Sequence, residues 1–439
     1  MSLSHIALAV GGVGFIWALF KKPDYIAILL FTTIIADINF DLPFMPLNFR
    51  AITTLCLLGK IMSENDKSIP SFLSVKYAWS IFLFVVYVLA TTANNGLWAM
   101  DITKEFILSL VAAYLAFHFY FKKNGYQIFK VSIILAGLSC LADLGYTYVI
   151  LGGFPVLRIY YLFTPSFAVC NHNFFGYICG AAFVFLLSDY LSTNSNNKIN
   201  LLMMPAMFLG VLLSTSRSSL LILIIVSLVL ISKGLVSQKK GKKASTLVVI
   251  TIACLFIVLF LFQIIQNFIS TDSDFFAQIT SRMIDEPMAM LNRAMGNQYD
   301  ANNLDSMDWR AEASSLAYNT YIGLPIMEKL FGIGYNGFYF RDYGHGYDAH
   351  NGILLIMIEF GFIGFLIYFG ILFALIIKSL RYRLESPFVV CLIFMIMYVA
   401  SHNKELTAFF CFLVTGTLAA QIYNKEVYEL EEETKFSFT

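Results

Sequence analysis

Long apolar runs, each about as long as a membrane span, follow one another along most of the chain and alternate with short polar stretches. A helix needs about 20 apolar residues to cross the hydrocarbon core of a bilayer. Repeated runs of this length therefore predict a bundle of membrane-crossing helices. We expect about 13 spans, at residues 4–20, 24–38, 51–63, 77–94, 105–121, 127–150, 174–192, 200–216, 219–236, 246–269, 352–378, 387–400 and 406–423.

Residues 270–351 interrupt this pattern, because polar and apolar positions are mixed there. Trp309 and Arg310 open a stretch expected to form an amphipathic helix to about Tyr321, and the glycines of LFGIGYNGF at 330–338 predict a turn. The end of the chain is acidic, and we expect it to fray from the last span. The predicted organisation is ten spans in 1–269, a large loop with short amphipathic helices at 270–351, three spans in 352–423 and an acidic cytoplasmic tail at 424–439.

The composition agrees with this pattern. Of the 439 residues, 59% are hydrophobic and 13% are charged, and the mean hydropathy is +0.73. Soluble domains carry about 25% charged residues. We therefore predict an all-α, polytopic integral membrane protein with about 12–13 transmembrane helices and one large loop outside the membrane. The net charge of +1 gives no basic field for nucleic acid, and the seven scattered cysteines form no CxxC pair, so we interpret them as small core residues.

Lysine and arginine are expected to lie on different sides of the membrane. Basic residues in short loops favour the cytoplasmic side, which places the lysine clusters and the C-terminus inside and residues 270–351 outside. Seven of the nine arginines then lie on the outer side: Arg50, Arg158, Arg217, Arg282, Arg293, Arg310 and Arg341. The guanidinium fork matches pairs of phosphate or carboxylate oxygens. This arrangement predicts an anionic ligand such as a lipid phosphate, and the alternative is that some of these arginines pair with acidic residues of the loop.

The first candidate for chemistry is YDAHNGILLIMIEFGFIGFLIY at 347–368. His350 and Asn351 stand where polar sequence gives way to an apolar run, and Asn is a favoured helix cap. An imidazole at this boundary can stay neutral and accept a proton. The alternative is an interfacial histidine that only bonds a carbonyl group.

Glu359 lies inside the same apolar run, half a helical turn out of phase with His350 and about 13.5 Å along the axis. The two side chains therefore cannot meet on one helix. We expect Glu359 to pair with a polar group of a neighbouring span, and Gly361 and Gly364 to permit close packing around it.

Two further polar groups head outward-facing spans. Arg217 lies in LLSTSRSSLLIL at 212–223 among five hydroxyl side chains, which together predict a phosphate seat or, alternatively, a snorkelling arginine at a turn. Asn171, His172 and Asn173 of CNHNFFG head another span downstream of Arg158, with interfacial capping as the alternative.

The long loop offers no other recognisable site. Its acidic residues lack a regular spacing for metal ligands, so we predict no metal site. The glycine-rich turn at 330–338 lacks the preceding strand and the GK[ST] end of a nucleotide-binding P-loop. Its aromatic residues suit either sugar rings or the membrane interface.

Five motifs resemble those of the O-antigen ligase and O-antigen polymerase family of bacterial envelope glycosyltransferases. They are the STSRS hairpin, NHNFFG, the WRAEA helix, the GIGYNGF turn and AHNGILLIMIEFGFIG, and the likeness covers about residues 150–380. One departure is His172, at a place where relatives often carry proline between two asparagines. The resemblance implies a multi-helix membrane glycosyltransferase of the GT-C type in the bacterial inner membrane, with its site facing the periplasm.

The resemblance also implies a reaction. A glycan linked by diphosphate to undecaprenol would be the donor, and a sugar hydroxyl on a second lipid-linked glycan or on lipid A-core would be the acceptor, without metal or cofactor. His350 matches the essential loop histidine of the family and would orient or deprotonate the acceptor, and Arg217 and Arg310 match arginines expected to hold the diphosphate. The other residues expected to bind substrate are Arg158, Arg341, Asn171, Asn173 and Asn351. Membrane lipid and a chain-length regulator protein are further expected partners.

Three functions remain open from the sequence. We favour an O-antigen polymerase, which joins lipid-linked repeat units, over an O-antigen ligase, which transfers the finished glycan to lipid A-core. Transfer to protein usually accompanies a larger C-terminal region than this acidic tail. A transporter or lipid flippase is the main rival outside the family, but such proteins often contain inverted repeats, and no internal repeat is recognisable here.

Overall fold

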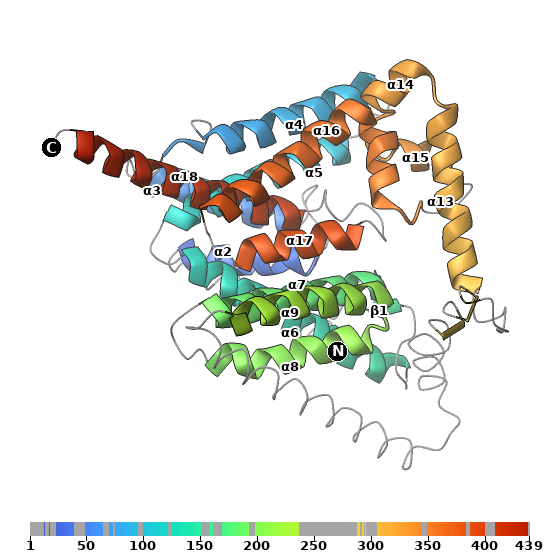
Figure 1. Cartoon of the computed structure of the whole chain (residues 1–439), viewed down its shortest axis with the longest axis horizontal. Coiled ribbons are helices and arrows are strands. Elements are labelled where there is room, and N and C mark those ends of the chain that lie inside the picture. The colour runs from blue at the N-terminus through green and yellow to red at the C-terminus, as the bar shows by residue number, and fades with distance from the viewer. Residues whose placement is uncertain are drawn as a thin grey trace, which may run out of the picture. The chain divides into compact units, whose positions relative to one another are not determined.

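The described part of the chain is helical apart from one short two-stranded ribbon (Figure 1). The structure is a computed structural model, and it describes residues 23–38, 49–64, 70–72, 75–94, 100–121, 125–151, 158–160, 169–192, 198–236, 305–343, 349–382, 387–399 and 409–437, together with a few isolated positions. Five of the described helices are long and apolar enough to cross a membrane. These helices confirm an all-α polytopic membrane protein, and the total of 12–13 spans stays a prediction.

Most helices begin and end close to the predicted spans. The helices outside the 270–351 segment are α2 (Pro23–Ile35), α3 (Phe49–Glu64), α4 (Lys76–Asn94), α5 (Met100–Phe121), α6 (Gly125–Leu151), α7 (His172–Ser192), α8 (Lys198–Leu213), α9 (Arg217–Val236), α16 (Gly352–Arg381), α17 (Pro387–Val399) and α18 (Phe409–Ser437). The predicted span at 246–269 and most of the one at 4–20 lie outside the described residues.

The chain forms two compact units, each with its own core. The first comprises residues 1–8 and 134–309, and the second comprises residues 9–133 and 310–439. The division falls within α6 and within α13 (Asp305–Gly323).

Helix α7 is the centre of the first unit, because 18 of its 21 residues are buried. Helices α8 and α9 pack along it. Apolar side chains on α9 such as Leu221, Leu228 and Val229 are exposed instead, as expected for a surface that faces lipid. Before α7, strand β1 (Arg158–Tyr160) pairs antiparallel with β2 (Val169–Asn171), a small ribbon that the apolar pattern did not predict.

In the second unit α5 packs along α18, and α4 packs along α16. A Cβ atom added at Gly416 of α18 would collide with the backbone of Ala113 in α5, so a glycine is what permits this close helix pair. Phe84 of α4 stacks on Tyr368 of α16, with ring centroids 4.6 Å apart. These contacts give α16 a fixed neighbour on its membrane-spanning length.

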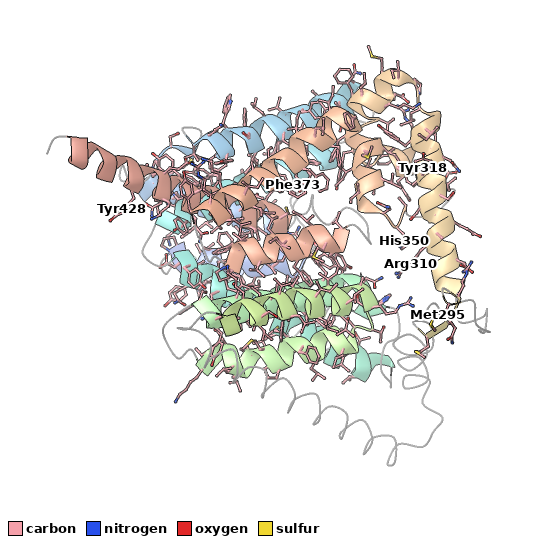
Figure 2. The ribbon with its side chains drawn as sticks, viewed as in Figure 1. Met295, Arg310, Tyr318, His350, Phe373 and Tyr428 are labelled. Atoms are coloured by element: carbon pink, nitrogen blue, oxygen red, sulfur yellow. The ribbon has the colours of Figure 1, made fainter. Side chains whose placement is uncertain are left out.

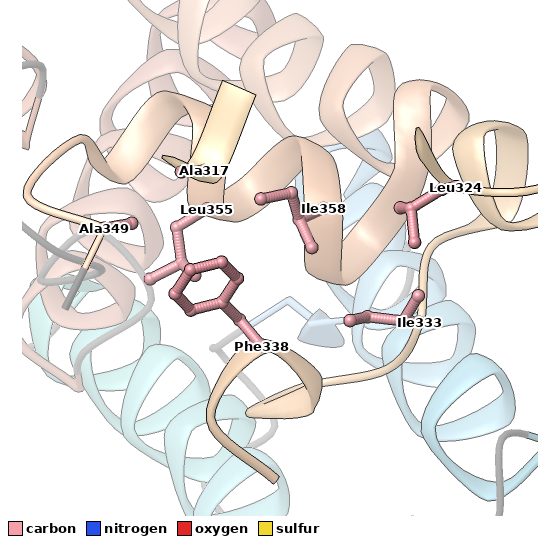
Figure 3. Close-up of a cluster of buried hydrophobic side chains, with 7 residues drawn as sticks. All are labelled: Ala317, Leu324, Ile333, Phe338, Ala349, Leu355 and Ile358. Atoms are coloured by element: carbon pink, nitrogen blue, oxygen red, sulfur yellow. The ribbon is translucent and has the colours of Figure 1, made fainter. Parts of the chain in front are cut away.

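Three helices precede α16: the long α13 and the short α14 (Ile326–Phe331) and α15 (Gly337–Phe340). Figure 3 shows the apolar cluster that joins α13, α15 and the segments flanking α14 to the first turns of α16. Its members are Ala317, Leu324, Ile333, Phe338, Ala349, Leu355 and Ile358. The glycine-rich turn is confirmed, since Gly332, Gly334 and Asn336 all have positive φ angles.

Two predicted boundaries are wrong. Helix α13 begins at Asp305, four residues before Trp309, and acidic residues such as Asp305 and Asp308 suit the first turn of a helix. Helix α18 continues to Ser437, whereas the sequence pattern ended it at 423 and predicted a frayed tail. One contact that supports the extension joins Lys378 Nζ to Glu426 Oε1 at 3.2 Å.

Candidate functional site

His350 lies at the entrance to α16 in an unusual backbone conformation. Its φ angle is +46°, in the left-handed region that non-glycine residues rarely adopt. Asn351 follows as the N-cap, and its Oδ1 accepts a hydrogen bond of 3.1 Å from the backbone N–H of Leu354. The imidazole is half-buried with its Nδ1 atom shielded from solvent. Strained residues of this kind persist where the surroundings hold them, often at functional sites.

Helix α13 lies against this entrance. The hydroxyl group of Ser314 donates a hydrogen bond of 3.4 Å to the carbonyl oxygen of Ala349, the residue before His350. Arg310 lies four residues before Ser314, so both occupy the same face of α13. Figure 2 labels both Arg310 and His350. The structure therefore brings Arg310 to the side of α13 that faces the loop carrying His350.

Arg341 has a structural partner. Its Nη1 atom lies 2.8 Å from Glu328 Oε1, which ties the end of α15 to α14. Burial lowers the pKa of Arg341, but its hydrogen bonds to Glu328 and Tyr343 outweigh this effect and raise the pKa above its ordinary value. The guanidinium is therefore permanently charged and already used by a carboxylate, and its binding to a substrate stays a prediction.

Arg217 is the first residue of α9, at the end of a tight connection from α8. Ser214 donates to the carbonyl oxygen of Val211 at 2.7 Å and accepts from the N–H of Ser216 at 3.2 Å. Thr215 between them has a φ angle of +52°, and its buried Oγ1 atom has no hydrogen-bond partner among the described residues. Arg217 therefore emerges half-buried from a connection lined by hydroxyl groups.

The entrance to α7 packs against this connection. A Cβ atom at Gly176 would collide with Ser214 and Ser216, so α7 approaches as closely as a glycine allows. His172 and Asn173 are both buried, and they precede Gly176 by four and three residues, which places them on the same face of the helix. The structure thus brings the CNHNFFG and STSRS motifs together, although they are about 40 residues apart in the sequence.

Arg158 and Asn171 are also brought together, because they are register partners in the two-stranded ribbon. Opposed residues in an antiparallel pair have Cα atoms roughly 4.5–5.5 Å apart. Asn171 directly precedes α7. Four predicted residues therefore gather in the first unit: Arg158, Arg217, Asn171 and Asn173.

The remaining predicted residues belong to the second unit: Arg310, Arg341, His350 and Asn351. Each unit thus holds one group of candidates at a helix entrance. The convergence of the two groups around one ligand stays a prediction.

Sequence reasoning missed two side chains that hold the loop before His350. Tyr87 of α4 bonds the carbonyl oxygens of Phe331 and Phe360, and Thr92 accepts a hydrogen bond from the N–H of Tyr335. Both lie in an apolar span that shows no polar motif, so no signal in the sequence marked them. The predicted close packing at Gly361 and Gly364 is confirmed, whereas the partner of the buried Glu359 side chain stays a prediction.

The described residues supply guanidinium, imidazole and hydroxyl groups. Among them, no three His, Cys, Asp or Glu side chains cluster as metal ligands would. Guanidinium groups can stabilise charge that develops on a phosphate, and a positioned imidazole can accept a proton from a hydroxyl group. The arrangement suits transfer of a group from a phosphate to a hydroxyl, and its independence of metal stays a prediction.

Comparison with protein families agrees with this chemistry. Residues 202–369 match the family model described as O-antigen ligase. The match includes Arg217, Arg310 and His350, but it begins after the ribbon and α7 and excludes α4. No curated protein matches the chain significantly. The match supports glycan transfer of the O-antigen polymerase or ligase type.

Proposed function

We propose that this chain, which carries an O-antigen ligase family domain at residues 202–369, is an O-antigen polymerase of the bacterial inner membrane. It joins repeat units linked by diphosphate to undecaprenol, on the periplasmic side of the membrane. The observation that carries the proposal is the entrance to α16, where a left-handed His350 stands directly before the helix cap and beside the face of α13 that holds Arg310.

In the proposed reaction the acceptor hydroxyl oxygen forms a bond to the anomeric carbon of the donor sugar. The bond from that carbon to the diphosphate breaks, and its electron pair leaves with the lipid diphosphate. The imidazole of His350 takes the hydroxyl proton and later releases it to water. Arg217 and Arg310 stabilise the charge that develops on the leaving diphosphate.

Two features support a lipid-linked donor. The apolar helix α16 begins one residue after Asn351, so a reacting group at His350 lies where a lipid headgroup meets water. Two guanidinium groups and a hydroxyl-lined connection are suited to phosphate oxygens. The chemistry needs no redox group, and none of these steps requires a cofactor.

The alternative is an O-antigen ligase that transfers the glycan to lipid A-core, and the family match is consistent with either enzyme. Both enzymes would use the same donor and the same proton transfer, so the acceptor distinguishes them. A transporter or flippase is the third alternative, but it would leave the strained histidine without a chemical role.

Purified protein in liposomes separates these functions. A polymerase converts the lipid-linked repeat unit alone into a ladder of longer lipid-linked chains. A ligase leaves that substrate unchanged until lipid A-core is added, and then produces glycan on the core. Movement of the lipid-linked unit across the bilayer without any new glycosidic bond would overturn the proposal and indicate transport.

A further inference from the structure

Helix α16 is interrupted at Gly361, which has φ and ψ angles of +67° and 175°. Such a break leaves backbone carbonyl groups without their helical partners, and inside a bilayer no water replaces those partners. The N–H groups of Ile333 and Gly334 bond the carbonyl oxygens of Ile358 and Glu359 at 3.1 and 2.9 Å. The segment between α14 and α15 thus supplies hydrogen-bond donors to carbonyl groups at the break that have no partner within the helix.

Residues 332–334 and residues 358–361 of α16 form a close backbone contact, which we call the seam. Two glycines make this contact possible. Gly332 has a φ angle of +87°, and a Cβ atom there would collide with the backbone of Glu359 and Gly361. A Cβ atom at Gly361 would collide in turn with the backbone of Gly332 and Leu330. The two backbones therefore touch directly, with no side chain between them.

Helix α4 holds both sides of the seam. The Tyr87 hydroxyl lies 3.0 Å from the carbonyl oxygen of Phe331 on the loop side and 2.8 Å from that of Phe360 on the helix side. One turn further along α4, the buried Thr92 Oγ1 accepts a hydrogen bond of 3.0 Å from the N–H of Tyr335 and donates to Val88 of its own helix. Gly364 leaves the space that the Tyr87 ring occupies.

The seam is connected to His350 from two directions. The N-terminal segment of α16, residues 352–360, runs from the Asn351 cap to the seam as one continuous helix. Ile333 of the seam also belongs to the apolar cluster that contains Ala349 (Figure 3). Movement of the seam therefore moves the residues on both sides of His350.

We propose that Tyr87 and Thr92 are positioning residues for the transfer reaction, which fix the N-terminal segment of α16 and thereby the imidazole of His350. The inference rests on the proposed function. Both residues lie outside the part of the chain that matches the family model, so the membrane helices before residue 202 take part in building the site. The hydroxyl groups act through backbone carbonyl and N–H groups and do not touch substrate.

The test uses the full-length protein in liposomes with a lipid-linked repeat unit as substrate. Tyr87→Phe removes one hydroxyl group and should lower kcat about tenfold, since small misplacement of a reacting group has large effects on rate. The KM for the donor and the yield of folded protein should stay within twofold of wild type, because the arginines that hold the donor are unchanged. Thr92→Val should lower kcat similarly, and Thr92→Ser, which keeps the hydroxyl, should restore it.

Two variants on the same helix serve as matched controls. Tyr77→Phe removes the hydroxyl of a buried tyrosine ten residues earlier, and Thr91→Val removes a hydroxyl that donates to Tyr87 and Val88 carbonyls of its own helix. Both should keep wild-type kcat. If Tyr87→Phe and Thr92→Val lower kcat no more than these controls, the positioning role is wrong.

Hydrogen exchange of the peptide covering 349–358 separates this failure from failure of the proposed function. Faster exchange there in Tyr87→Phe, together with full activity of His350→Ala, means that α4 holds the entrance but His350 is not the proton acceptor. Unchanged exchange in Tyr87→Phe overturns the positioning role whatever the outcome for His350.

Discussion

The entrances to α9 and α16 have the same backbone feature, a residue with a positive φ angle directly before the N-cap. In each, a left-handed residue precedes the cap, Thr215 with a φ angle of +52° and His350 with +46°. The next residue, Ser216 or Asn351, offers its carbonyl oxygen to the first helical hydrogen bond, at 3.0 Å in both cases. The same turn therefore begins two apolar helices in two different units.

The two entrances differ in their side chains and in how closely neighbouring helices cover them. At α9 the Ser216 hydroxyl bonds Ser219 at 2.9 Å, and a neighbouring helix covers the turn so closely that only Gly176 fits. At α16 the cap uses Asn351, and the left-handed position carries a half-buried imidazole. In the proposed function one entrance holds an anion beside Arg217 and the other moves a proton, although their backbones are alike.

The largest expected effect comes from replacing His350, and two substitutions distinguish the contribution of its imidazole from that of its backbone conformation. Glycine accepts a φ angle of +46° without strain, so His350→Gly should fold as well as wild type, whereas His350→Ala should be slightly less stable. Both should reduce transfer at least about a thousandfold, since removal of a general base and its orientation has effects of this order. Initial rates in liposomes and the yield of folded protein measure the two properties. Normal activity of His350→Gly would mean that the turn, and not the imidazole, is what matters.

The seam offers a test on a single helix. Gly361→Ala introduces a Cβ atom at a positive φ angle and against the backbone of Gly332 and Leu330, so we expect a loss of roughly 2–4 kcal/mol of stability. Gly370→Ala on the same helix meets no atom within 4 Å and should be neutral or stabilising by up to about 1 kcal/mol. Thermal unfolding in detergent measures both, and equal midpoints would contradict the close contact at the seam.

The arginine at each entrance can be compared by conservative replacement. Arg217→Lys and Arg310→Lys keep the charge but lose paired donors, and one charged hydrogen bond is worth about 1.5–3 kcal/mol. The donor KM should therefore rise roughly tenfold to a hundredfold in each. Arg293→Lys is the matched control. Arg293 and Asp308 form an ion pair in which both side chains are exposed, so this substitution should leave the donor KM unchanged. Wild-type affinity in both entrance variants would argue against recognition of a diphosphate by the guanidinium forks.

The smallest expected effect concerns the cap of α16. Asn351→Ala removes the acceptor for the N–H of Leu354 and should lower stability by about 1 kcal/mol. Asn351→Asp keeps an oxygen in the same place and should retain wild-type stability. Chemical unfolding in detergent distinguishes the two, and a wild-type midpoint for Asn351→Ala would show that the cap contributes nothing.

The candidate residues were predictable to different degrees. His350, Asn351 and Arg217 were found because each interrupts a long apolar run at its boundary, where a polar side chain is conspicuous in the sequence. The cap made by Asn351 followed from residue preference alone. Tyr87 and Thr92 gave no such signal, because aromatic and hydroxyl residues are ordinary members of a membrane helix. Their partners lie 243 to 273 residues away in the sequence.

The sequence by itself determined the class of the protein and the positions of most described membrane helices, because the length and apolarity of a span are local properties set by the thickness of the bilayer. It also placed polar residues at the entrances to these helices. Only the tertiary structure decided which helix entrances have the same backbone conformation and that α16 is interrupted at Gly361. It also decided that Tyr87 of α4 hydrogen-bonds a carbonyl group at this interruption. These features depend on backbone groups satisfying one another across distant segments, and no residue type in one segment records the partner that it will meet in another.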